Sequence, residues 1–146
     1  MMKGSVVPNV LKCCILTQIY NFETNQWSRM PDLQPHRSKH ECMKYKDGVL
    51  LAGGMENTDN YTGGYYRKDV EFFNLTSSAW QKFPPLNHGR AEHVLVPVNG
   101  HPTVIGGATS WDDKEVSEKL YGRWLPWIKH NNDTRFMSAV KISDNL

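Results

Sequence analysis

The chain has 146 residues, of which 39% are hydrophobic and 22% charged, and its formal net charge is +2 from 17 basic and 15 acidic residues. This composition is typical of a folded domain rather than a disordered chain, and its mixed charges, without a basic block, argue against nucleic-acid binding. Five Trp, six Tyr and five Phe, together with eleven Gly and eight Pro, favour short strands joined by turns. We therefore expect an all-β protein.

The first predicted hairpin lies in the middle of the chain. Residues 39–45 are strand-like, and Asp47-Gly48 follows them as a dipeptide typical of tight hairpin turns. Residues 49–52 form the next strand, a short apolar run that ends at the pair Gly53-Gly54. This order predicts the first two strands of an antiparallel meander.

Two further strands complete this meander. After a polar loop, residues 69–75 form a third strand, and the turn Thr76-Ser77-Ser78 leads into a fourth strand that contains Trp80. Pro84-Pro85 ends the fourth strand, because proline cannot donate to a strand ladder. No segment shows a sustained 3.6-residue apolar period, so we expect no helix of useful length.

The same signals recur at a spacing of 53 residues. Residues 92–98, the turn Asn99-Gly100 and residues 103–105 repeat the first hairpin. A weaker third copy begins near residue 114 and needs one extra residue between Trp124 and Arg135. The positions that match at this spacing are Asn21 and Asn74, Trp27 and Trp80, Arg37 and Arg90, His40 and His93, and Gly53-Gly54 and Gly106-Gly107.

A repeat of about 50 residues with four strands, a glycine pair and a tryptophan resembles the Kelch repeat of β-propellers. The resemblance rests on LLAGG and TVIGG, on RKDVEFFNLTSSAW and IYNFETNQW, and on HRSKH and GRAEH, and it runs from about Ile15 to the end of the sequence. It implies an all-β, partial Kelch-type β-propeller made of four-stranded antiparallel blades. Two features depart from the pattern: EVSEKLYGRW puts charged residues in a third strand, and the first copy lacks its glycine-pair strand.

The repeat predicts five segments along the chain. Propellers close with about 4 to 8 blades, so two complete blades can be read in three ways. We favour a piece of a longer Kelch protein; the alternatives are a ring closed by self-association and a small open array. The predicted segments are an N-terminal extension or partial strand (1–14), the tail of an incomplete blade (15–34), two Kelch blades (35–86 and 87–130) and the first strand of a further blade (131–146).

Several repeated positions have predicted structural roles. We expect the glycine pairs to allow close approach between strands near the propeller axis, because a phosphate loop would also need a lysine and a following helix. Tryptophans are expected to pack between blades, and the paired histidines to make structural hydrogen bonds rather than to bind metal. These positions are Gly53, Gly54, Gly106, Gly107, Trp27, Trp80, Trp124, Arg37, Arg90, His40 and His93.

Nothing in the sequence indicates catalysis, a cofactor or a metal site, since no HExxH, GxSxG or P-loop pattern is present. Cys13, Cys14 and Cys42 have no CxxC spacing and are expected to be reduced thiols. The N-terminal segment is a poor match to a signal peptide, so we expect a soluble, cytoplasmic protein. Triplets for N-glycosylation at Asn60, Asn74 and Asn132 leave a secreted or cell-surface module as the alternative.

The best candidate for a binding site is the loop 55–68 after the first glycine pair, which carries Tyr61, Tyr65, Tyr66 and Arg67. Tyrosine, glycine and asparagine beside an arginine are typical of adaptable recognition surfaces. The equivalent loop of the next blade adds Trp111. The alternative is a loop whose tyrosines fold back onto the blade.

The resemblance to Kelch proteins implies that these loops form a protein-binding face. The function we expect is therefore a non-catalytic protein–protein interaction module, and the family suggests the substrate-recognition part of a ubiquitin-ligase adaptor. A piece of a Kelch-propeller enzyme, either a galactose-oxidase-like copper oxidase or a sugar epimerase, is the rival function. The expected partner is a protein that the sequence does not identify, with no nucleic acid or membrane.

Overall fold

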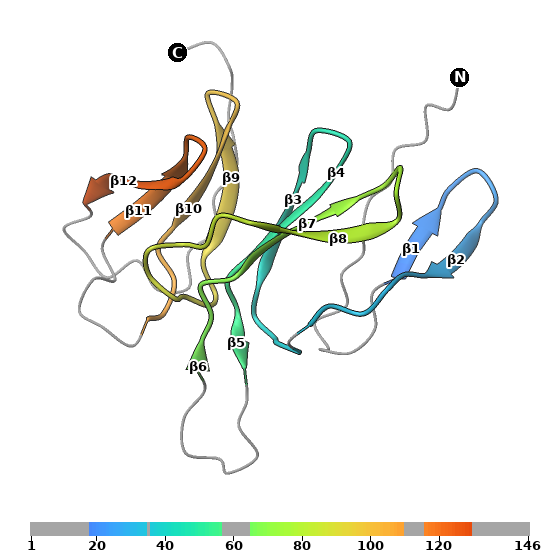
Figure 1. Ribbon diagram of the computed structural model, residues 1–146, viewed down its shortest axis with the longest axis horizontal. Coiled ribbons are helices and arrows are strands. Elements are labelled where there is room, and N and C mark those ends of the chain that lie inside the picture. The colour runs from blue at the N-terminus through green and yellow to red at the C-terminus, as the bar shows by residue number, and fades with distance from the viewer. Residues whose placement is uncertain (1–17, 35, 57–64, 110–115, 130–146) are drawn as a thin grey trace.

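The computed structural model describes residues 18–34, 36–56, 65–109 and 116–129, which form twelve β-strands and no helix (Figure 1). Antiparallel pairing joins them into two four-stranded sheets and two separate hairpins. The predicted all-β fold is confirmed. The expected extension 1–14 and the expected further strand 131–146 lie outside the described residues, as do Cys13, Cys14 and the triplets at Asn60 and Asn132.

The first blade is a four-stranded sheet in which each strand pairs with the next in the order β3-β4-β7-β8. A small hairpin, β5-β6, extends from it between β4 and β7. The strands are β3 (Glu41–Tyr45), β4 (Gly48–Ala52), β5 (Met55–Glu56), β6 (Tyr65–Tyr66), β7 (Val70–Asn74) and β8 (Ala79–Phe83).

The second blade repeats this meander in the order β9-β10-β11-β12, with an irregular register between Val116 and Glu118. A further hairpin, β1-β2, has the repeat positions of the last two strands of a blade. The fold is therefore a partial Kelch-type β-propeller. The strands are β1 (Gln18–Asn21), β2 (Gln26–Arg29), β9 (Val94–Val98), β10 (His101–Ile105), β11 (Val116–Leu120) and β12 (Trp124–Lys129).

One predicted turn is displaced by a residue. The turn of the β3-β4 hairpin is formed by Lys46 and Asp47, and Gly48 already pairs with Tyr45 in the ladder. A Cβ on Gly48 would overlap the carbonyl oxygen of Phe73, so this glycine is required by strand packing rather than by the turn. The turn Asn99-Gly100 lies where it was predicted, with φ of 50° and 76°.

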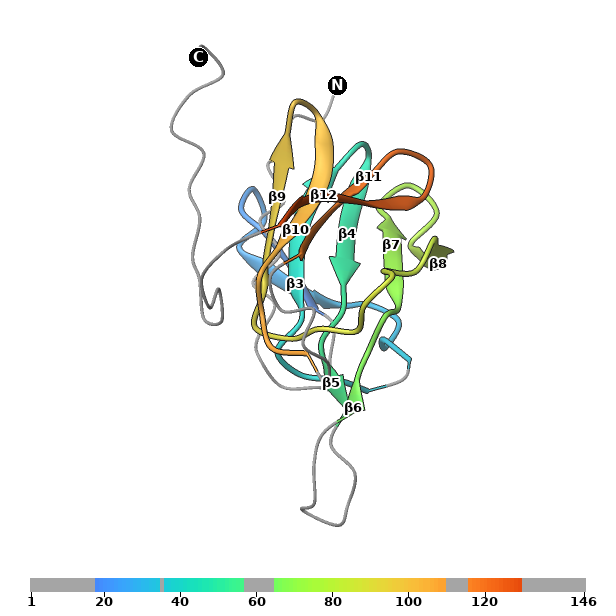
Figure 2. The same ribbon diagram turned by 90° about the vertical axis from the view of Figure 1, so that its left-hand side faces the viewer.

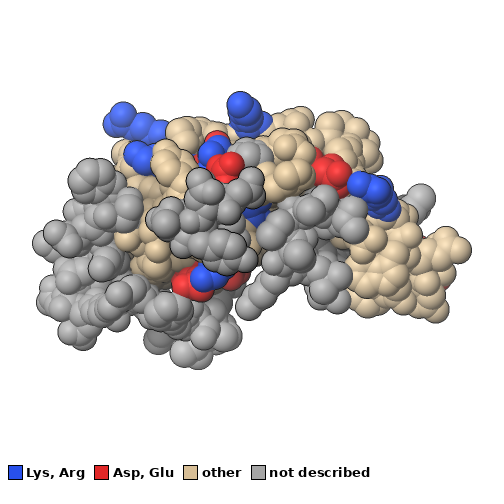
Figure 3. All heavy atoms as spheres, turned by 90° about the horizontal axis from the view of Figure 1, so that it is seen from below, with Lys and Arg blue, Asp and Glu red and all other residues tan. Residues whose placement is uncertain are grey.

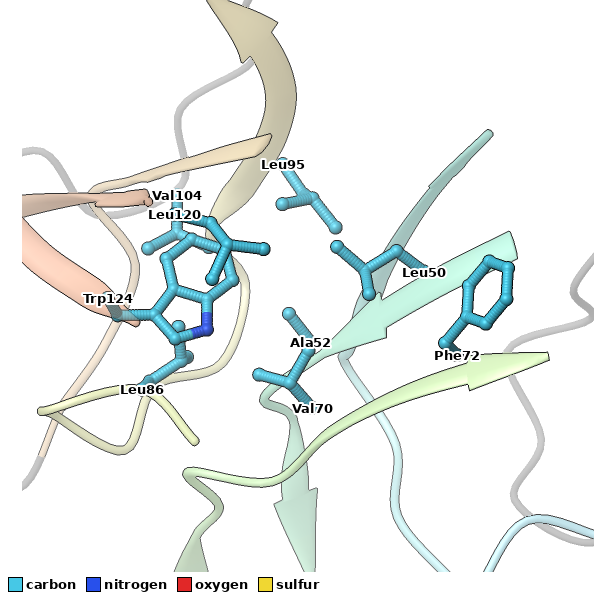
Figure 4. Packing of buried hydrophobic residues seen from close by; sticks show 9 residues of the cluster. All are labelled: Leu50, Ala52, Val70, Phe72, Leu86, Leu95, Val104, Leu120 and Trp124. Atoms are coloured by element: carbon cyan, nitrogen blue, oxygen red, sulfur yellow. The ribbon is translucent and has the colours of Figure 1, made fainter. Parts of the chain in front are cut away.

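The hydrophobic core lies between the two blades (Figure 4). Leu50 and Ala52 of β4 face Leu95 of β9, while Trp124 and Leu120 close the cluster from the second blade. The innermost strands β3 and β9 lie side by side (Figure 2). Burial of this apolar surface, at about 25 cal/mol per Å², joins the blades. In the described part of the chain, no helix is long and apolar enough to span a bilayer.

Candidate interaction face

The first glycine pair lies where the first blade meets the second. Gly53 and Gly54 have φ of 62° and 105°, in the region that favours glycine. A Cβ on Gly53 would lie 2.5 Å from the carbonyl oxygen of Arg90 and 2.8 Å from the ring of His93. The amide of Gly54 donates to the same Arg90 carbonyl at 2.8 Å. Backbone contact across the blade joint thus requires these positions to have no side chain.

The second glycine pair has the same geometry. Gly106 and Gly107 have φ of 66° and 90°. A Cβ on Gly107 would lie 2.6 Å from the carbonyl oxygen of Ala91 and 2.7 Å from Cβ of His93. Both pairs therefore bring the end of a second strand against the segment that precedes a first strand. Neither has the lysine of a phosphate-binding loop beside it.

Each repeated arginine is buried in an ion pair with a glutamate that the sequence analysis did not single out. Arg37 binds Glu71 of β7 through its two terminal guanidinium nitrogens, Nη1 and Nη2. Arg90 Nη2 donates to Glu118 Oε1 of β11 at 2.8 Å, and its Nη1 donates to the Gly106 carbonyl at 2.8 Å. All four charged side chains are buried. A buried charge is tolerated in this way only when it is paired and hydrogen-bonded.

Glu118 also holds the connection between the blades. Its carboxylate accepts hydrogen bonds from the amide and the side-chain Nδ2 of Asn87, both at 2.8 Å, and from the amide of His88 at 3.2 Å. This gives a structural role to one charged residue of the third strand, Glu118. The carboxylate satisfies an arginine and the backbone of the connecting segment together.

The repeated histidines pack against the glycine pairs, His93 beside Gly53 and Gly107 and His40 beside Gly54. Burial lowers the pKa of His93 to about 3, with further lowering by Arg90 and His40, and a hydrogen bond with the Ala52 backbone opposes the shift. Burial and Arg37 lower the pKa of His40 to about 4, and a hydrogen bond with the Arg37 backbone opposes the shift. A neutral ring therefore fills the space beside each glycine pair, and the structural role of the histidines as hydrogen-bonding groups stays a prediction.

The described residues offer no cluster of metal ligands. Among the described residues, no group of three or more His, Cys, Asp or Glu side chains is close enough to hold an ion. Burial, with a smaller effect of Glu41, raises the pKa of the Cys42 thiol to about 11, so this thiol stays protonated at neutral pH.

The tryptophans differ in their surroundings. Trp80 and Trp124 each donate from Nε1 at 2.8 Å to a proline carbonyl of the preceding repeat, Pro31 and Pro84 respectively. Trp27 is 49% exposed and contacts Tyr20 at 5.0 Å between ring centroids. Among the described residues no proline carbonyl lies against Trp27 as Pro31 and Pro84 lie against the other two indoles, so the inter-blade packing of Trp27 stays a prediction.

The predicted binding loop begins and ends in the β5-β6 hairpin. Arg67, which follows β6, is fixed by two carboxylates: its Nη1 lies 2.9 Å from Glu56 Oε2 and its Nε lies 2.7 Å from Asp69 Oδ2. The guanidinium lies 5.7 Å from the centre of the Tyr65 ring, and Tyr65 itself is 63% exposed. Tyr65 and Arg67 are thus brought together at the base of the loop.

The base of this loop is also tied to both blades. Arg67 donates its amide to the Gly54 carbonyl and accepts from the amide of Arg90. A Cβ on Gly89 would overlap the carbonyl oxygen of Tyr66, so the hairpin and the connection to the second blade touch. Tyr66 is partly buried by this contact, whereas Tyr65 is not. The other two predicted binding residues, Tyr61 and Trp111, lie outside the described residues.

The face that carries β5-β6 mixes charges of both signs. Viewed from that side, acidic and basic side chains lie next to one another, and the grey atoms of residues that are not described cover part of the surface (Figure 3). No extended single-sign patch is visible in this view. Such a surface suits recognition by aromatic and hydrogen-bonding contacts better than by long-range charge.

No family model matches the chain. Beta-scruin of Limulus polyphemus is 26% identical over 141 residues, which cover 90% of this chain and 15% of that protein. Kelch domain-containing protein 10 of Xenopus laevis is 29% identical over 116 residues (73% of this chain, 26% of that protein). Kelch domain-containing protein 8B of Homo sapiens is 27% identical over 96 residues (62% and 27%). The chain thus spans at most 27% of the length of these relatives.

A similar fold is found among solved structures. The structure of YjhT superimposes with a TM-score of 0.64 over 86% of this chain and 54% of that one. The sequence identity is 13%, so the likeness shows the shared fold alone.

Proposed function

The chain carries the repeats of the Kelch family, and on that premise we propose that it is a non-catalytic protein–protein interaction module. The observation that carries this proposal is the arrangement at the base of the β5-β6 hairpin. An exposed tyrosine, Tyr65, stands beside an arginine, Arg67, that two carboxylates hold in place. Exposed Tyr and Arg side chains are the residue types that dominate protein interfaces.

Rigid support makes this pair suited to binding. A side chain that is already ordered loses less conformational entropy when a partner binds. The backbone hydrogen bonds from Arg67 to Gly54 and from Arg90 to Arg67 fix the base of the hairpin to both blades. Tyr65 therefore presents its ring from a fixed support, with a phenol that can donate and accept hydrogen bonds.

The finer proposal is that this module selects the substrate of a ubiquitin-ligase adaptor in the cytoplasm. It is supported by the resemblance of the repeats to Kelch proteins, together with the greater length of the relatives named above. In this proposal the partner is a protein, and neither nucleic acid nor a membrane takes part. Further blades, from self-association or from a longer chain, would close the propeller.

The experiment replaces Tyr65 by the photo-crosslinking residue p-benzoylphenylalanine in the full chain. Ser77, which is exposed in the turn between β7 and β8, receives the same residue as the matched control. We expect a discrete crosslinked partner from position 65 and none from position 77. Equal crosslinking from both positions would contradict the proposed face.

The captured protein is then purified and its affinity for the chain is measured. Tyr65→Ala should weaken binding on the order of tenfold, whereas Ser77→Ala should leave it unchanged. Metal analysis of the purified chain tests the enzymatic alternative, since a copper oxidase would hold one copper per chain. Stoichiometric copper would overturn the non-catalytic proposal.

A further inference from the structure

A groove is lined by residues at or beside the β3-β4, β9-β10 and β11-β12 turns. These turns are at the end of the molecule opposite β5-β6 (Figures 1 and 2). We call the groove the turn-side groove. Its volume is about 660 Å³, within the range of about 300–1,000 Å³ that small-ligand sites occupy. The residues that shape it are Tyr45, Lys46, Phe83, His101, Leu120 and Tyr121.

The wall from the first blade is aromatic. The rings of Tyr45 and Phe83 lie 6.0 Å apart, edge to face, and Phe72 packs behind both, at 6.2 Å from Tyr45 and 5.6 Å from Phe83. Three mutually packed rings hold one another in position. This wall therefore presents a preformed apolar surface rather than a flexible one.

The wall from the second blade is also made of stacked rings. The ring centres of His101 and Tyr121 lie 4.2 Å apart, and His101 Nδ1 lies 3.0 Å from the carbonyl oxygen of Leu120. Because that oxygen can only accept, Nδ1 must carry the proton, which fixes the orientation of the imidazole. Tyr121 remains 51% exposed, a large fraction for an aromatic side chain that lines a groove.

One cation lies among the residues that line the groove. Lys46 is exposed, and its ammonium lies 5.2 Å from the centre of the Tyr45 ring. Lys119 is 3% exposed and is not part of the lining, although its ammonium lies 5.4 Å from the centre of the Tyr121 ring. No Asp or Glu is among the described residues that line the groove, and Asp47, the acidic residue next to Lys46, accepts a hydrogen bond from Asn74 at 3.2 Å. A ligand that enters between the rings thus meets one exposed cation, Lys46, at the wall of the first blade.

We propose that the turn-side groove binds a short acidic peptide segment of a partner protein. An aromatic side chain of the segment would lie between the two ring walls, and a neighbouring Asp or Glu would lie beside Lys46. Aromatic grooves recognise extended peptides in this way, and a carboxylate adds charge complementarity. The site is at the opposite end of the molecule from Tyr65, so it can succeed or fail independently of the proposed interaction face.

Single-stranded nucleic acid is the other ligand that aromatic rings and cations could attract. The structure favours a peptide. Phosphate backbones are bound by a track of several cations, and the described lining supplies one, Lys46. The net charge of +2 also gives little long-range attraction for a polyanion.

Fluorescence anisotropy with labelled tetrapeptides and the full chain tests the proposal. The probe is fluorescein-labelled Asp-Trp-Glu-Asp, with Asp-Ala-Glu-Asp and Lys-Trp-Lys-Lys as its matched comparisons. We expect saturable binding of the first and at least about fivefold weaker binding of the other two. No saturable binding of the first peptide, or equal binding of all three, would overturn the proposal.

Variants locate the binding on the molecule. Tyr121→Ala and Lys46→Glu should each weaken the acidic tryptophan peptide at least about fivefold. Their matched controls are Phe22→Ala, an aromatic residue that is 55% exposed on the β1-β2 hairpin, and Lys44→Glu, an exposed lysine of β3 outside the lining.

The controls should change the affinity less than about twofold. Equal losses in Lys44→Glu and Lys46→Glu would show a general charge effect and would contradict the groove. Displacement of the peptide by an oligothymidylate would indicate the nucleic-acid alternative instead.

Discussion

The two blades bury the same kinds of side chain, but the residues that surround these side chains differ. Each buries an arginine against a glutamate of its third strand, and each directs the indole of its fourth strand to a proline carbonyl. Trp124 is 2% exposed, whereas Trp80 is only partly buried. A repeated position thus has one geometry but a burial that depends on what lies against it.

The blades also differ in how their third strands are held. Glu118 of the second blade binds Arg90 and three donors of the connecting segment. The hydrogen bonds of Glu71 in the first blade run to Arg37. The comparison indicates that one carboxylate fastens the second blade to its connecting segment.

The largest expected effect comes from breaking the second ion pair. Arg90→Met leaves Glu118 buried without its cation, and we expect the free energy of unfolding to fall by about 3–5 kcal/mol. Urea denaturation of the full chain measures it. Arg37→Met is the matched variant in the first blade. It should have a smaller effect, because the carboxylate of Glu71 is slightly exposed and that of Glu118 is fully buried.

A double variant separates the charge from the packing. Arg90→Met combined with Glu118→Leu removes both charges, so it should recover part of the stability that Arg90→Met loses. A double variant less stable than Arg90→Met alone would show that the hydrogen bonds to Asn87 and His88 matter more than the unpaired charge.

Mild acid should destabilise both blades through their equivalent histidines. The folded pKa values of about 4 for His40 and about 3 for His93 lie below the ordinary value of 6.5, so the unfolded chain binds protons that the folded chain does not. The contribution of the two neutral histidines to the free energy of unfolding is fully present above pH 6.5 and is lost as the pH falls below it. Between pH 7.5 and pH 5 we expect a loss of about 2 kcal/mol for each histidine.

Denaturation at the two pH values measures this loss, and variants assign it. His93→Gln should remove about half of the pH dependence, whatever its effect on stability at pH 7.5. The range stops at pH 5 because carboxylates titrate below it. An unchanged pH dependence in both His93→Gln and His40→Gln would contradict the assignment.

Much of the fold could be predicted because its signals are local. Turn residues, alternating short strands and the 53-residue spacing correctly indicated two four-stranded meanders. The two buried glutamates were missed for a physical reason. Glu71 lies 17 residues after Gly54, but Glu118 lies 11 residues after Gly107, because the loop that precedes the third strand is shorter in the second blade. A search for one acidic residue in each third strand would have found both.

The remaining features of the site depend on three-dimensional contacts, which the spacing of the repeats does not reveal. The spacing shows that Trp27 and Trp80 are equivalent, but it does not show that Trp27 is half exposed. It pairs His40 with His93 without showing that their rings lie against the glycine pairs. The binding loop was chosen from its composition, and the ion pairs that fix Arg67 became visible only in three dimensions.

A smaller effect distinguishes two kinds of glycine in the second blade. Gly100 has φ of 76°, and a Cβ at this position would meet nothing within 4 Å, so Gly100→Ala tests backbone strain alone and should cost about 1 kcal/mol. Gly107→Ala adds overlap with the Ala91 carbonyl and should cost about 2 kcal/mol or more. Thermal unfolding of the two variants measures the difference. Equal losses would show that the close approach of Gly107 to the Ala91 carbonyl within the second blade contributes nothing.

The smallest effects come from the tryptophan series, which tests the difference in burial directly. Replacing each indole by Phe keeps a ring but removes the N–H that Trp124 and Trp80 donate to a proline carbonyl. Trp124→Phe should cost about 1–2 kcal/mol, because the Pro84 carbonyl loses its partner in a buried site. Trp80→Phe should cost less, and Trp27→Phe should stay within about 0.5 kcal/mol. A loss at Trp27 as large as at Trp124 would mean that this exposed ring is covered in solution, which would favour closure of the array by a second copy.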